Sequence, residues 1–194
     1  MQFLGKKYCV LIVSASEKGT EYITTLLAPE VFFSVISNNI SEAKRLVLEN
    51  SFDIIIINTP LPDEFGTEFA LDASLDTNAG IMLLVKSEYA DEISERMGAH
   101  GVVTVAKPTS RQMLTQAIRI LCATRERLKK LEKKNETLKE KMDEIRIVNR
   151  AKWALIEYLK MSESEAHHYI EKQAMDMRIT KRKAAENIIK TYEY

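Results

Sequence analysis

The 194-residue sequence has little of the chemistry that marks secreted, metal-binding or membrane proteins. Its only cysteines, Cys9 and Cys122, give neither a disulfide framework nor the spacing of a metal site. No apolar run approaches the roughly 18 to 20 residues that a membrane span needs, and the first residues lack the apolar stretch of a signal peptide. We therefore expect a cytoplasmic protein with no metal, no other cofactor and no membrane partner.

Glycine and proline are also scarce, and residues 109–194 contain neither. A heptad pattern runs through this part of the chain, with Leu121 at an a position, and its charged residues lie between the seam positions. Asparagine at an a position can pair with its equivalent in a parallel two-stranded coiled coil, so we predict a homodimer through a helix over residues 112–150. The alternative is an amphipathic helix packed on its own chain. The predicted seam consists of Leu121, Leu128, Leu131, Asn135, Leu138, Met142, Ile145 and Asn149.

The formal net charge of zero hides an asymmetry along the chain. Residues 1–110 carry 8 Lys and Arg against 15 Asp and Glu, and residues 111–150 carry 12 against 6. A polyanionic partner is therefore expected to meet the C-terminal part of the chain. Charge by itself does not distinguish RNA from DNA or from a solvated coil.

Five short apolar runs alternate with amphipathic stretches in the N-terminal part. Continuous β-branched runs indicate strands buried on both faces, as in a parallel sheet covered by helices. We predict a doubly wound α/β domain, in which sites lie at the carboxyl ends of the strands. The predicted strands are 8–13, 31–36, 54–57, 81–85 and 102–105, and the predicted helices are 20–27, 41–48, 66–73 and 90–97.

These residues resemble the receiver domains of two-component response regulators, which have a CheY-like, flavodoxin-like fold. The resemblance rests on VLIV in the first strand, on IIIINTPLPDEFG at the third, and on Lys107-Pro108 after the fifth. It assigns residues 1–122 to a receiver-like domain that continues into the predicted coiled coil. The resemblance also implies a phosphoacceptor Asp after the third strand and an acidic pair after the first that holds Mg²⁺.

This sequence departs from the receiver pattern at most of those positions. Asn58 stands at the acceptor position, Ser14 and Ala15 at the acidic pair, and Val85 where a Thr or Ser is usual, so that only Lys107 remains. An amide is a poor nucleophile, and Ser-Ala offers Mg²⁺ no carboxylate. We predict a pseudo-receiver with no catalytic residues, in which nearby carboxylates such as Asp63 have surface or turn roles.

Three helical stretches close the chain. One ends near residue 160, the second starts at a capping box formed by Ser162 and Glu165, and Thr180 can cap the third. Residues 131–192 resemble the ANTAR domain, the RNA-binding module of transcription antitermination regulators, through Ala151-Lys152, Ser162 to Ala166, Ala174-Met175 and Ile188-Ile189. Trp153 departs from the small residue that the family usually has after Ala-Lys.

The ANTAR resemblance implies a regulator that binds stem-loops of a nascent leader RNA and stabilises an antiterminator. We expect RNA and not DNA as the nucleic-acid partner, and a regulatory protein partner is possible in place of phosphate control. The alternative is a coiled-coil adaptor controlled by a protein partner, whose basic residues are merely solvated. The candidate RNA contacts are Lys152, Lys172, Gln173, Arg178, Lys181 and Arg182, with His167 or His168 as stacking partners.

Overall fold

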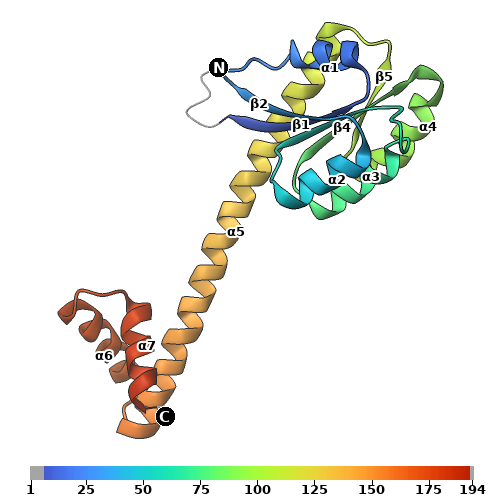
Figure 1. Ribbon diagram of the computed structural model, residues 1–194. Coiled ribbons are helices and arrows are strands. Elements are labelled where there is room, and N and C mark those ends of the chain that lie inside the picture. The colour runs from blue at the N-terminus through green and yellow to red at the C-terminus, as the bar shows by residue number, and fades with distance from the viewer. Residues whose placement is uncertain (1–6, 193–194) are drawn as a thin grey trace. The chain divides into compact units, whose positions relative to one another are not determined.

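The computed structural model describes residues 7–192, which divide into two compact units between Lys129 and Lys130. The N-terminal unit is an α/β domain, and the C-terminal unit is all-helical (Figure 1). No helix among the described residues is long and apolar enough to cross a membrane.

A five-stranded parallel sheet forms the centre of the N-terminal unit. Its strand order is β2-β1-β3-β4-β5, so β1 is the point from which the sheet winds in both directions. The strands are β1 (Tyr8–Ser14), β2 (Phe32–Ser37), β3 (Ile54–Asn58), β4 (Gly80–Lys86) and β5 (Val103–Lys107). The predicted doubly wound receiver-like fold is confirmed.

Helices cover both faces of this sheet (Figure 1). Leu11 and Val13 point into a core closed by α2 (Ile40–Glu49), α3 (Thr67–Asp76) and α4 (Ser87–Gly98). The alternate residues Val10 and Ile12 point into the opposite core, which α1 (Glu17–Thr24) and the first turns of α5 close. The continuous apolar strands are thus explained by burial on two faces.

Helix α5 runs from Arg111 to Leu159 without interruption. Ser110 opens it, because its hydroxyl accepts a hydrogen bond from the Met113 amide at 3.2 Å. Leu121 is buried in the N-terminal unit and packs against Gly80, where a side-chain carbon would lie 3.1 Å from it. This corrects the predicted seam. Leu121 packs in the core of its own chain, so the exposed part of the seam starts at Leu128.

The C-terminal unit packs the end of α5 against α6 (Glu163–Asp176) and α7 (Lys181–Tyr192). Its core is built from alanine, leucine and isoleucine, and Ala151, Leu155 and Ile170 are almost fully buried. The turn between α6 and α7 places Arg178 at a φ of 54°, with its amide donating to the Met175 carbonyl and the next amide, that of Ile179, donating to the Ala174 carbonyl. This pattern is a Schellman motif, which ends α6 and sends the chain back along it.

One carboxylate fastens α5 to the sheet of the N-terminal unit. The side chain of Asp53, only 12% exposed, lies 2.7 Å from Lys129 Nζ and 3.4 Å from Arg125 Nε, and it accepts a hydrogen bond from the Cys9 amide. Burial by itself would raise the pKa of Asp53, but Lys129, the Cys9 amide and Arg125 together hold that pKa below its usual value. The same lysine lies 5.3 Å from the centre of the Tyr8 ring, a cation–π contact.

Replacing Asp53 tests this attachment. Asp53→Asn leaves Arg125 and Lys129 without their partly buried counter-charge, so we expect a loss of about 2 kcal/mol, between the values for exposed and buried pairs. Hydrogen exchange of the β1 and β3 amides in the full chain should then speed up about 30-fold. The difference from wild type should shrink as the pH falls through the folded-state pKa of Asp53, because the stabilising charge is lost there.

Asp72→Asn is the matched control, because Asp72 lies exposed on α3. A change of less than about 0.5 kcal/mol is expected for it. Equal exchange rates in the two variants would show that Asp53 does not fasten the helix.

Candidate functional site

The carboxyl ends of β1, β3 and β5 bring three of the predicted site residues together. Asn58 Nδ2 donates a hydrogen bond to Ser14 Oγ at 3.0 Å, and Lys107 Nζ donates to Asn58 Oδ1 at 2.7 Å and also to the Thr59 carbonyl. Gly19 on α1 permits this arrangement, because a side-chain carbon there would lie 2.6 Å from Asn58 Nδ2. The cluster is therefore neutral except for one ammonium group.

The other two residues predicted for this cluster lie apart from it. Ala15 is exposed beyond the end of β1, whereas Val85 points into the core beneath α4. Burial lowers the pKa of Lys107, and the nearby charge of Lys86 adds to the effect. Among residues 7–192, no group of three or more His, Cys, Asp or Glu side chains is placed to hold a metal ion.

Asp63 has a structural role at a neighbouring helix. Its carboxylate accepts hydrogen bonds from the Ile40 amide at 3.0 Å and the Ser41 amide at 2.9 Å, at the start of α2. These bonds, the Ile40 amide first, lower the pKa of Asp63 to about 2. This carboxylate thus stabilises a helix N-terminus and does not stand in for a missing metal ligand.

The candidate RNA contacts lie in the C-terminal unit. Lys152, near the end of α5, lies 2.9 Å from Glu163 at the start of α6, and only 16% of its side chain is exposed. Lys172 and Gln173 belong to α6, and Arg178 lies in the turn after it. These four residues, together with Lys181 and Arg182 in the first turn of α7, form the candidate RNA-binding surface of the C-terminal unit.

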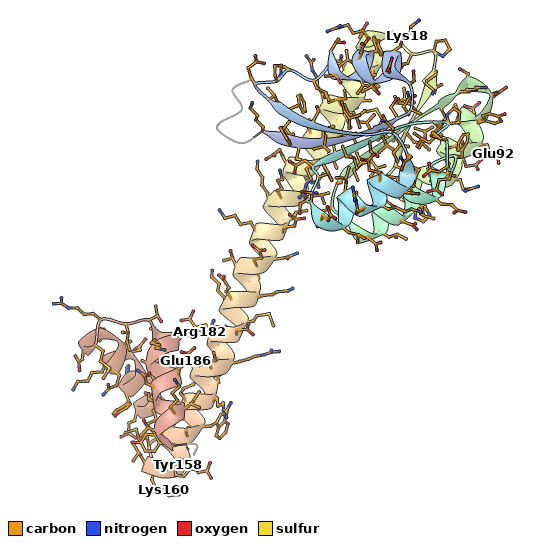
Figure 2. The ribbon with its side chains drawn as sticks, viewed as in Figure 1. Lys18, Glu92, Tyr158, Lys160, Arg182 and Glu186 are labelled. Atoms are coloured by element: carbon orange, nitrogen blue, oxygen red, sulfur yellow. The ribbon has the colours of Figure 1, made fainter. Side chains whose placement is uncertain are left out.

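Carboxylates neutralise several of these cations. Lys181 Nζ lies 2.6 Å from Glu171, which also lies near His167 and His168, and Arg182 Nε lies 3.1 Å from Glu186 one turn further along α7 (Figure 2). Lys181 therefore holds the pKa of Glu171 below its usual value. An RNA phosphate at α7 would have to replace these carboxylates as the partner of Lys181 and Arg182.

A hollow beside Lys152 includes residues that the sequence reasoning did not assign to a site, among them Trp153 and Ile156. Asn149, Trp153 and Ile156 of α5 line it with Lys152 and Glu163, and its volume is about 250 Å³. Trp153 is 70% exposed although it is flanked in sequence by the buried Ala151, Ala154 and Leu155. The sequence could have shown this, because at 100° per residue Trp153 points away from the helix face that carries Ala151 and Leu155.

Comparison with known proteins decides what the C-terminal unit is. Residues 136–189 match the model of the ANTAR domain family. The chain carries an ANTAR domain. This match lies within the predicted range of 131–192 and includes the whole of α6 and most of α7.

A relative with a regulatory name is similar over most of the chain. The chain is 27% identical over 150 residues to the transcriptional regulatory protein PdtaR of Mycobacterium tuberculosis, a match that covers 77% of this chain and 73% of PdtaR. The chain thus has a receiver-like fold before its ANTAR domain.

Solved structures match the receiver unit in fold. The chemotaxis response regulator CheY4 of Vibrio cholerae has a TM-score of 0.53 at 18% identity, over 60% of this chain and 99% of that one. Adenylate cyclase from Rhodopirellula baltica has a TM-score of 0.61 at 17% identity, over 68% of this chain and 98% of that one. At such identities the likeness concerns the fold alone, and the receiver and ANTAR families themselves are regulatory.

The contribution of the capping box to the stability of the start of α6 can be tested by substitution. Ser162 Oγ accepts a hydrogen bond from the Glu165 amide, and the Glu165 carboxylate accepts one from the Ser162 amide at 2.8 Å. Ser162→Ala should cost about 1 kcal/mol and speed hydrogen exchange of the first α6 amides about fivefold. Ser164→Ala, two residues further on and exposed, is the control, and equal effects of the two would contradict the capping role.

Proposed function

We propose that this protein is an RNA-binding transcription antitermination regulator that stabilises an antiterminator stem-loop in nascent leader RNA. The observation that carries the proposal is the ANTAR match at residues 136–189 behind a receiver fold. PdtaR, which is similar over most of its length, is named as a transcriptional regulator. Such a role places the protein with the transcribing polymerase in the cytoplasm.

The surface of the ANTAR domain has the chemistry that RNA recognition needs. Within the described part of the domain, Lys172 and Arg178 form no salt bridge with a carboxylate and can meet phosphates directly, while Lys152 and Lys181 are paired with glutamates. Single-stranded loops expose both phosphates and unstacked bases to such a helical surface. Loop binding therefore combines a salt-sensitive term with a base-dependent one.

The exposed seam of α5 supports a homodimer as part of the proposal. Five apolar side chains at heptad positions stand 39% to 60% exposed on a helix whose other faces are charged. Burying them in a second copy would remove this apolar surface from water, and Asn135 and Asn149 at a positions would fix a parallel register. Two ANTAR domains could then engage two stem-loops with increased avidity. The five are Leu128, Leu131, Leu138, Met142 and Ile145.

The receiver unit takes no phosphate in this proposal. Asn58 occupies the acceptor position with its amide bonded to Ser14 and Lys107, and neither Ser14 nor Ala15 supplies a carboxylate for Mg²⁺. Phosphoryl transfer to a side chain needs both an anionic oxygen nucleophile and the metal. The RNA-binding activity is then controlled by something other than phosphate, and we propose a regulatory protein partner.

Binding of the unphosphorylated protein to two-hairpin leader RNAs tests the main proposal. We expect binding that depends on loop sequence, weakens as salt rises, and weakens further in Lys152→Ala. Fluorescence anisotropy of labelled RNA at low and moderate salt measures all three. Lys18→Ala, on the receiver unit, is the control and should bind as wild type does (Figure 2). Loop-indifferent or absent binding would favour the adaptor alternative.

Labelling with acetyl phosphate tests the receiver part of the proposal. In the presence of Mg²⁺, the intact protein should take up no phosphate, as judged by mass spectrometry. Asn58→Asp by itself should also stay unlabelled, because it restores the nucleophile without the metal ligands. Phosphate found on the receiver unit of the wild-type protein would contradict the pseudo-receiver interpretation.

A further inference from the structure

The single tryptophan of the chain lies at the edge of the hollow between the end of α5 and the start of α6. Asn149, Trp153 and Ile156 follow at intervals of four and three residues, so they share one helix face. The core face of α5 is a different one, since Ala151 and Leu155 are fully buried while Trp153 is 70% exposed. The indole is therefore not required by the packing of the ANTAR domain.

The walls of the hollow combine polar and apolar groups. The indole of Trp153 and the side chain of Ile156 give flat apolar surface, while Asn149 offers an amide and Lys152 and Glu163 offer a donor and an acceptor 2.9 Å apart. An unpaired nucleobase has the matching chemistry, with a flat aromatic face and an edge of mixed donors and acceptors. An apolar protein side chain in this hollow would cover Asn149 without offering its amide a partner, at a desolvation cost.

Charge near the indole favours the same occupant. Arg146 precedes Trp153 by two helical turns and 76% of its side chain is exposed, with Asp143 3.9 Å away. Lys160 lies just past the end of α5, with a φ of 57°, and is exposed (Figure 2). Surfaces that bind single-stranded nucleic acid combine such cations with exposed aromatic rings, because the cations attract the backbone while a base stacks.

We propose that Trp153 stacks on an unpaired base of the RNA loop, with the Lys152–Glu163 pair and Asn149 reading that base's edge. This inference rests on the proposed function and adds to it the residue that senses the loop. The glutamate repels phosphates, so the base and not the backbone enters the hollow. Base discrimination thus comes from this hollow, whereas the salt-dependent affinity comes from the basic residues elsewhere on the domain.

Because Trp153 is the only tryptophan, its fluorescence reports on this contact in the full-length protein. Titration with a two-hairpin RNA should quench the emission, and the same RNA with its loops closed into duplex should not. Anisotropy of labelled RNA gives the affinity independently. Trp153→Phe should keep affinity within about threefold, while Trp153→Ala should lose about 10- to 100-fold for the looped RNA with an unchanged salt slope.

Met175→Ala is the matched control, because Met175 is 72% exposed on α6 and should bind RNA as wild type does. Far-ultraviolet circular dichroism confirms that each variant keeps its helices. RNA binding without a change in Trp153 emission, and with Trp153→Ala equal to wild type, would overturn this inference while leaving the proposed function standing. No binding of any RNA would overturn both.

A second copy of the chain is the competing occupant of the hollow, since Asn149 belongs to the predicted seam. In that case Trp153 emission would shift to shorter wavelength as protein concentration rises, and RNA would not change it further. That result would also overturn the inference. Concentration-independent emission that RNA quenches supports it.

Discussion

Helix α5 has to bury apolar side chains in two separate cores, and this requirement governs the rest of the chain. Leu114, Leu121 and their neighbours close one face of the receiver sheet, whereas Ala151 and Leu155 form the centre of the ANTAR core. Between Cys122 and Ile147, the apolar side chains of the helix pack into neither of these two cores. The absence of glycine and proline after residue 108 is what allows one helix to serve both ends.

The receiver and the predicted partner use the same side of the helix at successive positions along it. At 100° per residue, Leu114, Leu121 and Leu128 lie within about 40° of one another, and Leu131 lies about 80° from Leu121. Asp53 forms ion pairs with Lys129 at a b position of the heptad and with Arg125 at an e position. These contacts leave the a and d positions beyond Leu121 exposed. The receiver core and a coiled-coil dimer are therefore compatible on the same helix, with Leu121 as the point where the pattern passes from one use to the other.

Much of this architecture could be predicted from residue patterns, because burial on two faces leaves a strong mark. Strands such as Ile54 to Ile57 and the capping box at Ser162 were identified in advance and confirmed by the structure. Leu121 was misassigned because a heptad leucine and a sheet-facing leucine look alike in sequence. Asp53 and Trp153 could not be assigned to roles, since a carboxylate's partners and the openness of a helix face depend on contacts between residues far apart in the chain.

In the proposed pseudo-receiver, the receiver cleft is still lined in part by α5. The cavity beside Asn58 is about 380 Å³ in volume and is lined by Lys107 and Thr109 and by Leu114 of the first turns of α5. A group that enters this cleft touches the helix directly, and Leu114 is fully buried in the core that holds the helix on the sheet. A signal can therefore reach α5 by displacing packed side chains, without a phosphoryl group, since packed cores respond to occupancy by shifting between discrete arrangements.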